Sequence, residues 1–263
     1  MGIYLFIFGS CLGSFINVVI YRLPLNQSIV YPNSRCPKCE VKIKWFDNLP
    51  IVSWLFLRGK CRACKARISY SYPIIELLTG ILLWLNIYAD PTIYSYQPIL
   101  IKIFFGSIFI ILLIALAILD LKYFWLPQAL TLFGIFSGLT SSFLIDLFSK
   151  IDQFSHSISS LVAASLGFVI FYLLSHIGKK ILNKPVMGGG DLKLSALIGS
   201  WLGIQGLFIS IWLAFISAGI FIVLGLILNK IKSNQKIPFG VFLSLSSLAV
   251  WYFGNQIFLK LIF

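Results

Sequence analysis

The chain has 263 residues, of which 59% are hydrophobic and only 11% are charged, and its mean hydropathy is +0.95. A soluble domain is nearer half apolar and about one quarter charged, so this composition argues against a surface that faces water on all sides. The net charge of +13 at pH 7 would suit a nucleic-acid-binding protein, but here the basic residues flank apolar segments, which argues against that class. The composition indicates a membrane protein.

Apolar runs long enough to cross about 30 Å of hydrocarbon predict an all-α fold with about eight membrane spans. Spanning segments should be helical because unpaired backbone amides are costly in lipid. The predicted spans are 2–21, 73–89, 97–119, 127–145, 158–177, 191–206, 207–228 and 238–259. The sixth is short, contains Asp191 and Lys193, and runs almost directly into the seventh. No basic residue precedes the first run and no small-x-small site precedes Arg22, so we expect it to stay as a helix rather than to be a cleaved signal peptide.

The distribution of basic residues predicts the orientation in the membrane. Ten of the 21 lysines and arginines lie between Arg22 and Arg67, in the long segment after the first span. Placing this segment in the cytoplasm puts eight more on the same side: Lys122, Lys179, Lys180, Lys184, Lys193, Lys230, Lys232 and Lys236. Only Lys102, Lys150 and Lys260 then lie outside. The positive-inside rule therefore predicts that both termini are outside.

The segment 22–72 is polar and basic, and it contains four of the five cysteines. They form two pairs, Cys36-Pro-Lys-Cys39 and Cys61-Arg-Ala-Cys64. Two such CxxC knuckles supply four thiolates for one tetrahedral zinc ion, and a site with four protein ligands is structural. Disulfides are the alternative, although a reducing cytoplasm disfavours them. Cys11 stands alone in the first span and is predicted to be a small buried apolar residue.

The chain thus divides into a first transmembrane helix (1–21), a cytoplasmic zinc-binding domain (22–72) and a transmembrane bundle (73–263). Three acids, Glu76, Asp120 and Asp191, lie within or at the ends of apolar spans, where an ionised group is costly and usually functional or paired. Asp120 ends the third span and Asp191 opens the sixth. Both are predicted near the cytoplasmic face, so we expect them to meet.

Two carboxyl groups in one site share a proton, so that one acts as a base and the other as an acid on a water between them. Three glycines, Gly188, Gly189 and Gly190, precede Asp191; they would let a substrate backbone approach, and they permit positive φ angles. The alternative is structural: Asp191 as a helix-end acid stabilised by the macrodipole, and Asp120 paired with Lys122 or another base.

Several segments together resemble the bacterial type IV prepilin peptidase family, the GxGD membrane aspartic proteases, over nearly the whole chain. These segments are Gly13 to Pro24, Cys36-Pro-Lys-Cys39, Asp47-Asn48-Leu49-Pro50, Gly59 to Cys64, Tyr72 to Glu76, Met187 to Lys193 and Ile237-Pro238-Phe239-Gly240. The chain departs from the family pattern at Lys122, Gln128 and Val241. These positions do not carry the catalytic role, so cleavage is still expected.

The resemblance implies a bifunctional enzyme of the bacterial inner membrane that serves type IV pilus biogenesis, type II secretion or both. It would cut the basic leader of prepilins and pseudopilins after a glycine on the cytoplasmic side, with Asp120 and Asp191 as the catalytic pair. It would then N-methylate the new amino terminus with S-adenosylmethionine. No glycine-rich loop locates this cofactor, and Glu76 is a weak candidate for binding it; a buried partner for a lysine or arginine is an equal interpretation of this residue.

A proton-coupled membrane transporter, with the three acids as a proton relay, is the main alternative from another class. Such transporters often contain inverted repeats, and none is visible in this sequence. A preflagellin-type GxGD protease is less compatible with the cysteine insert. A non-enzymatic assembly factor would leave the two aspartates unexplained.

Overall fold

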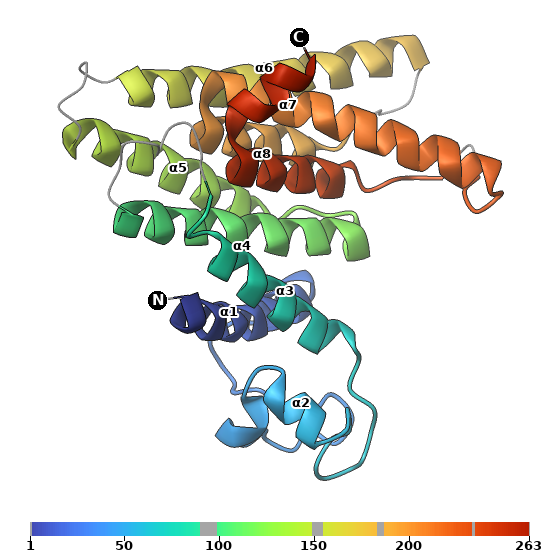
Figure 1. Ribbon diagram of the computed structural model, residues 1–263. Helices are drawn as coiled ribbons and strands as arrows, with labels where there is room; N and C mark the ends of the chain where they lie inside the picture. Colours follow the sequence, from blue (N-terminus) through green and yellow to red (C-terminus); the bar gives the residue numbers. More distant parts are fainter. Residues whose placement is uncertain (1, 90–98, 149–154, 183–186, 233–234, 263) are drawn as a thin grey trace. The chain divides into compact units, whose positions relative to one another are not determined.

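The computed structural model describes residues 2–89, 99–148, 155–182, 187–232 and 235–262, and within them it confirms the all-α prediction (Figure 1). The helices are α1 (Gly2–Arg22), α2 (Val52–Phe56), α3 (Ser71–Leu85), α4 (Ile99–Tyr123), α5 (Gln128–Phe148), α6 (Ser155–Leu182), α7 (Gly189–Ile227) and α8 (Phe239–Ile262). Short 3-10 helices, η1 and η2, cover Leu23–Leu25 and Trp45–Asn48. In these ranges β-type pairing is limited to two isolated bridges.

The prediction of about eight spans is confirmed only in part. Among the described residues, five helical segments are long and apolar enough to cross a membrane: Gly2–Leu25, Ile99–Tyr123, Gln128–Phe148, Ser155–Ile181 and Gly189–Ile227. Two shorter apolar helices cover Ser71–Leu85 and Phe239–Asn255. Residues 97–98 of the third predicted span, and two lysines used for the orientation, Lys150 and Lys184, lie outside the described residues.

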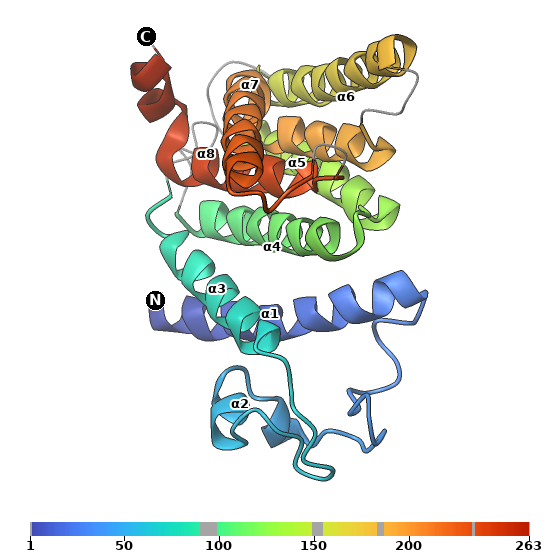
Figure 2. The same cartoon turned by 90° about the vertical axis from the view of Figure 1, so that its right-hand side faces the viewer.

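The predicted sixth and seventh spans, 191–206 and 207–228, lie in one segment of 39 residues, α7, which consists of two helices joined at a kink. The kink is at Gly203, where φ is 67° and ψ is −172°. This conformation is open essentially to glycine alone, so the sequence allows the bend here. Figure 2 shows α7 as two pieces that run in different directions.

The chain forms two compact units, Met1–Ile87 and Tyr88–Phe263. In the first unit α1 packs closely along α3, because glycines remove the side chains that would separate them. A Cβ atom on Gly9 would lie 2.9 Å from Gly80 Cα, and one on Gly13 would lie 2.7 Å from Glu76 Cα. Asn17 Nδ2 donates to the Tyr72 carbonyl near the start of α3. The end of α1 therefore runs past α3 and lies beside the insert.

In the second unit α7 packs against α5, α6 and α8, and its first half is almost entirely buried. Trp201 is central to this packing: its Nε1 donates to the Gly134 carbonyl at 2.8 Å, and its ring stacks on Phe109 at 5.1 Å. Phe109 also contacts Trp251 of α8 at 5.1 Å between ring centroids. These aromatic contacts fix the first half of α7, and with it Asp191, inside the bundle.

Candidate functional sites: a carboxyl pair and a four-cysteine cluster

Asp120 lies at the C-terminal end of α4, in the second unit. The helix ends three residues later, where Phe124 adopts a left-handed φ of 51° and its amide donates to the Asp120 carbonyl at 2.9 Å. The side chain of Asp120 is buried, and its Oδ2 atom makes no hydrogen bond within the described part of the chain. A buried oxygen without a partner is unusual in a folded protein and indicates a functional group.

Asp191 lies in the first turn of α7, after Gly188 as the N-terminal cap residue. Its amide donates to the Gly188 carbonyl at 3.1 Å, and its side chain is half-buried. The unpaired amides at a helix N-terminus stabilise a negative charge there. This stabilisation is the structural alternative foreseen for Asp191, and it is compatible with a catalytic role.

The segments that carry the two aspartates come together in the second unit, and the two carboxyl groups interact electrostatically. Leu126, in the α4–α5 connection, lies between their supporting segments. A Cβ atom added to Gly190 would lie 2.8 Å from Leu126 Cβ, and one added to Gly240 would lie 3.3 Å from Leu126 Cδ1. The pairing of Asp120 with Lys122 is not observed among the described residues, where the ion pair formed joins Arg62 and Asp47.

The start of α8 is a part of this site that sequence reasoning did not identify. The backbone amides of Gly240 and Val241 act on the Asp120 carboxyl group, so this aspartate, like Asp191, lies at a helix N-terminus. A Cβ atom on Gly240 would lie only 2.8 Å from Asp120 Oδ2. In the sequence, the segment Ile237 to Gly240 was identified only because it resembles the family. Its Pro-Phe-Gly sequence at a helix start was the available signal that it contributes to the site.

The three glycines before Asp191 have different surroundings. Gly189 is exposed, and a Cβ atom added to it would meet nothing within 4 Å, whereas Gly190 packs against Leu126. The sequence permits positive φ angles at these glycines, but none of the three adopts one. The exposed Gly188 and Gly189 leave open space beside Asp191, which fits an approaching substrate backbone.

The four cysteines of the insert converge in the first unit. One thiol sulfur from each of Cys36, Cys39, Cys61 and Cys64 lies within 4.8 Å of all the others, and the Cys36 and Cys64 sulfurs are 3.8 Å apart. Four thiolates around zinc, with Zn–S near 2.3 Å, give sulfur–sulfur separations of about 3.8 Å. None of these cysteines forms a disulfide. The donor set and its size therefore fit a metal ion.

The two knuckles have the same local geometry. Each begins at an isolated bridge, Arg35 with Lys42 and Lys60 with Arg67, and in each the residue after the second cysteine has a positive φ: 56° at Glu40 and 57° at Lys65.

Backbone amides are also directed at the sulfurs. Those of Lys38 and Cys39 lower the pKa of the Cys36 thiol to about 6, which favours the thiolate form that binds metal.

An ion pair holds the two halves of the insert together. Arg62 Nε and Nη2 donate to both carboxyl oxygens of Asp47 at 2.6 to 3.1 Å, and these hydrogen bonds hold the pKa of Asp47 below its usual value. The Arg62 guanidinium also lies 5.4 Å from the Phe46 ring centroid. Asp47 thus supports the insert instead of the carboxyl pair.

Glu76 is buried on α3 and holds the insert to the helix. Its Oε2 accepts a hydrogen bond from the Ile51 amide at 2.7 Å, and it also interacts with the Ser14 hydroxyl of α1. In the described part of the chain it forms no ion pair with a lysine or arginine. Cys11 is exposed on α1, not buried as predicted.

An apolar helical bundle with two neighbouring aspartates, preceded by a four-cysteine insert, defines a polytopic membrane protein with an acid pair and a cysteine cluster that fits a metal ion. Residues 7–89 match the family model of the bacterial peptidase A24 N-terminal domain, and residues 107–223 match that of the type IV leader peptidase family. The chain belongs to the type IV leader peptidase family.

Several curated relatives are named prepilin leader peptidase/N-methyltransferase. The protein of Neisseria gonorrhoeae is 32% identical over 275 residues, which cover 95% of this chain and 90% of the relative. That of Aeromonas hydrophila is 32% identical over 277 residues, with 96% and 90% covered. That of Myxococcus xanthus is 38% identical over 200 residues, which cover 76% of this chain and 56% of the relative. No solved structure matches the chain.

Proposed function

We propose that this chain is a prepilin leader peptidase/N-methyltransferase in which Asp120 and Asp191 form the catalytic pair. It removes the leader of prepilins and N-methylates the product, as its relatives' shared name states. The observation that carries the catalytic assignment is that two acids 71 positions apart in the sequence come together, Asp191 in the first turn of α7 and Asp120 at the end of α4 beside the start of α8. Membership of a peptidase family leaves the transporter alternative without support.

The pair acts by general acid–base catalysis. Two carboxyl groups this close share one proton, so one activates a water molecule while the other protonates the oxygen of the peptide carbonyl. The amides of Gly240 and Val241 face Asp120, and the N-terminus of α7 surrounds Asp191; both stabilise the ionised form. The exposed Gly188 and Gly189 let the extended leader approach Asp191.

The four-cysteine cluster holds a structural zinc ion in this proposal. Cys36, Cys39, Cys61 and Cys64 would fill all four positions of a tetrahedral site, which leaves none for substrate. The ion would order an insert that contains little buried apolar surface of its own.

The protein spans the bacterial inner membrane several times, with the insert and the carboxyl pair on the cytoplasmic side. Five helices long enough to cross the bilayer support the multi-pass arrangement, and the clustering of basic residues between Arg22 and Arg67 supports the orientation. The substrates are prepilins and pseudopilins; the basic leader and the cut after glycine follow from the family resemblance.

Replacing either aspartate by asparagine tests the catalytic assignment. Asp120→Asn and Asp191→Asn should each abolish leader removal from a prepilin, because an amide can neither share the proton nor activate water. The measurement is the mass of the prepilin after incubation with membranes that contain equal amounts of each inserted variant. Normal processing by either variant would remove that residue from the catalytic pair.

Asp146→Asn provides a matched control in the same unit. Asp146 accepts hydrogen bonds from the amides of His156 and Ser157 at the start of α6, a role that asparagine also fills. This variant should cleave the prepilin at the wild-type rate.

A further inference from the structure

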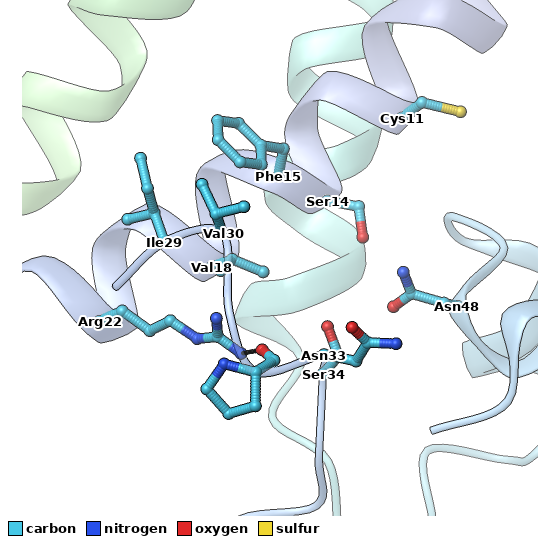
Figure 3. A pocket seen from close by; sticks show the side chains of 11 residues that line it. Cys11, Ser14, Phe15, Val18, Arg22, Ile29, Val30, Asn33, Ser34 and Asn48 are labelled. Carbon is cyan, nitrogen blue, oxygen red and sulfur yellow. Dashed lines mark hydrogen bonds between the residues drawn. The ribbon is translucent and has the colours of Figure 1, made fainter. Parts of the chain in front are cut away.

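The first unit contains a pocket of about 380 Å³ beside the second half of α1 (Figure 3). Its volume lies within the range of small-molecule sites, roughly 300–1,000 Å³. It is lined by Cys11, Ser14, Phe15, Val18, Arg22, Ile29, Val30, Pro32, Asn33, Ser34 and Asn48. The pocket exists because α1 extends beyond the start of α3, so that the insert covers this part of α1 instead.

Apolar and polar groups line different sides of the pocket. Figure 3 shows Phe15 and Val18 near Ile29 and Val30, whereas Asn33, Ser34 and Asn48 gather opposite Ser14. Phe15 lines the pocket, so its ring can contact a ligand there. Flat apolar surface next to amide and hydroxyl groups suits a heteroaromatic ring whose edge carries both donors and acceptors.

Arg22 supplies a fixed positive charge at the pocket. Two of its five guanidinium N–H groups donate to the carbonyls of Ser28 and Pro32 at 3.0 and 2.6 Å, which orients the side chain. The other three make no hydrogen bond within the described residues. A fixed guanidinium with free donors is a binding group for a carboxylate.

A buried carboxyl group lies behind the opposite wall. Ser14, which lines the pocket, interacts with the Glu76 carboxyl group. Arg22 and this Ser14–Glu76 pair therefore place a guanidinium and a carboxyl group at one small site. A ligand that carries a carboxylate, a separate positive centre and a heteroaromatic ring matches this distribution.

We propose that this pocket binds S-adenosylmethionine as the donor for the N-methylation step. The inference rests on the proposed function. It assigns the N-methylation activity to the first unit, whereas the carboxyl pair belongs to the second unit. Arg22 binds the amino-acid carboxylate, Asn33 and Asn48 bind the adenine and ribose, and Phe15 contacts the adenine or the sulfonium. In the transfer, the lone pair of the substrate's new α-amino group bonds to the methyl carbon as the methyl–sulfur bond breaks. The electron pair stays on sulfur, and the amine releases a proton to water.

Filling the pocket tests the assignment without removing a hydrogen bond. Val18 lines the pocket and its side chain has no polar role, so Val18→Trp should block the ligand. Equilibrium dialysis of radiolabelled S-adenosylmethionine against protein in nanodiscs should show roughly a tenfold or greater loss of affinity. Ile7→Trp, on an exposed part of the same helix away from the pocket, should bind as the wild type does. Unchanged binding by Val18→Trp, or no binding by the wild type, overturns the proposal.

Arg22→Gln provides a second, chemical test, with Arg67→Gln as the matched control on an exposed arginine that does not line the pocket. Arg22→Gln should weaken the binding of S-adenosylmethionine and lower the fraction of product whose mass includes the added methyl group. Arg67→Gln should change neither quantity.

Leader removal, read from the same mass spectra, separates this inference from the proposed function. Val18→Trp should still remove the leader. If the wild type fails to remove a leader, the proposed function fails; if it removes the leader and Val18→Trp methylates normally, only this pocket assignment fails.

Discussion

The carboxyl group of Asp120 lies against the backbone at the start of α8. It occupies the space that Gly240 leaves by lacking a Cβ atom, which would lie 2.8 Å from Oδ2 and 3.1 Å from Cγ. The same absence brings the amides of Gly240 and Val241 to the carboxyl group. Gly240 therefore controls both the position of Asp120 and its electrostatic surroundings.

We expect Gly240→Ala to lower leader removal about tenfold or more, since the added methyl must displace the Asp120 carboxyl group or the start of α8. The measurement is the initial rate of prepilin cleavage by equal amounts of folded protein. Gly219→Ala is the matched control, because a Cβ atom there would meet nothing within 4 Å. A Gly240→Ala variant that cleaves at the wild-type rate would contradict this account of the site.

At the scale of the element, sequence patterns predicted features that depend on neighbouring residues along the chain. The apolar runs located the helices, and the two CxxC pairs located the cysteine cluster. The left-handed conformations at Glu40 and Lys65 escaped prediction, because glycine is the residue expected there. The partner of Glu76 also escaped, because a hydrogen bond to the Ile51 amide depends on how the insert folds back.

The carboxyl pair could be predicted from the cost of acids in apolar spans, but its supporting groups could not. Gly240 and Leu126 take part through backbone amides and contact, neither of which leaves a charge or spacing pattern in the sequence. The break in α7 was predicted as the boundary between the spans 191–206 and 207–228. Its position at Gly203 was not predicted, since a glycine in an apolar run looks like an ordinary small residue.

The cysteine cluster is an element whose order we expect to depend on metal. Cys36→Ser or Cys61→Ser should lower the bound zinc, measured by atomic absorption, and expose the segment 22–70 to added protease. Structural zinc contributes folding free energy directly, so protein abundance should fall as well. Some leader removal should persist, because the carboxyl pair belongs to the other compact unit.

Cys11→Ser is the control for this prediction. Cys11 is exposed and lies outside the cluster, so the variant should keep its zinc and its resistance to protease. A stable variant that lacks all four cluster cysteines and contains no zinc would contradict the structural role of the metal.

At the scale of the whole molecule, the bend in α7 decides how often the chain crosses the membrane. A straight helix of 39 residues would be about 58 Å long, nearly twice the hydrocarbon thickness. The piece before Gly203, Gly189–Leu202, is only about 21 Å long, but it is almost entirely buried among other helices. Protein surrounds it in place of lipid, so the usual length for a span does not apply.

The side on which the C-terminus lies tests this bend. If the two pieces of α7 run in opposite directions across the bilayer, the apolar segments number eight and both termini lie outside, as the basic residues predict. If α7 crosses once, the count is seven and the C-terminus lies in the cytoplasm. We expect a C-terminal alkaline phosphatase fusion to be active, because this enzyme folds outside the cytoplasm. A C-terminal green fluorescent protein fusion should be dark, because that protein becomes fluorescent only when it folds within the cytoplasm. The same two fusions to a chain truncated after residue 70 should give the reverse pattern, an inactive phosphatase and a fluorescent protein. They control for expression. A fluorescent C-terminal fusion would contradict two crossings by α7.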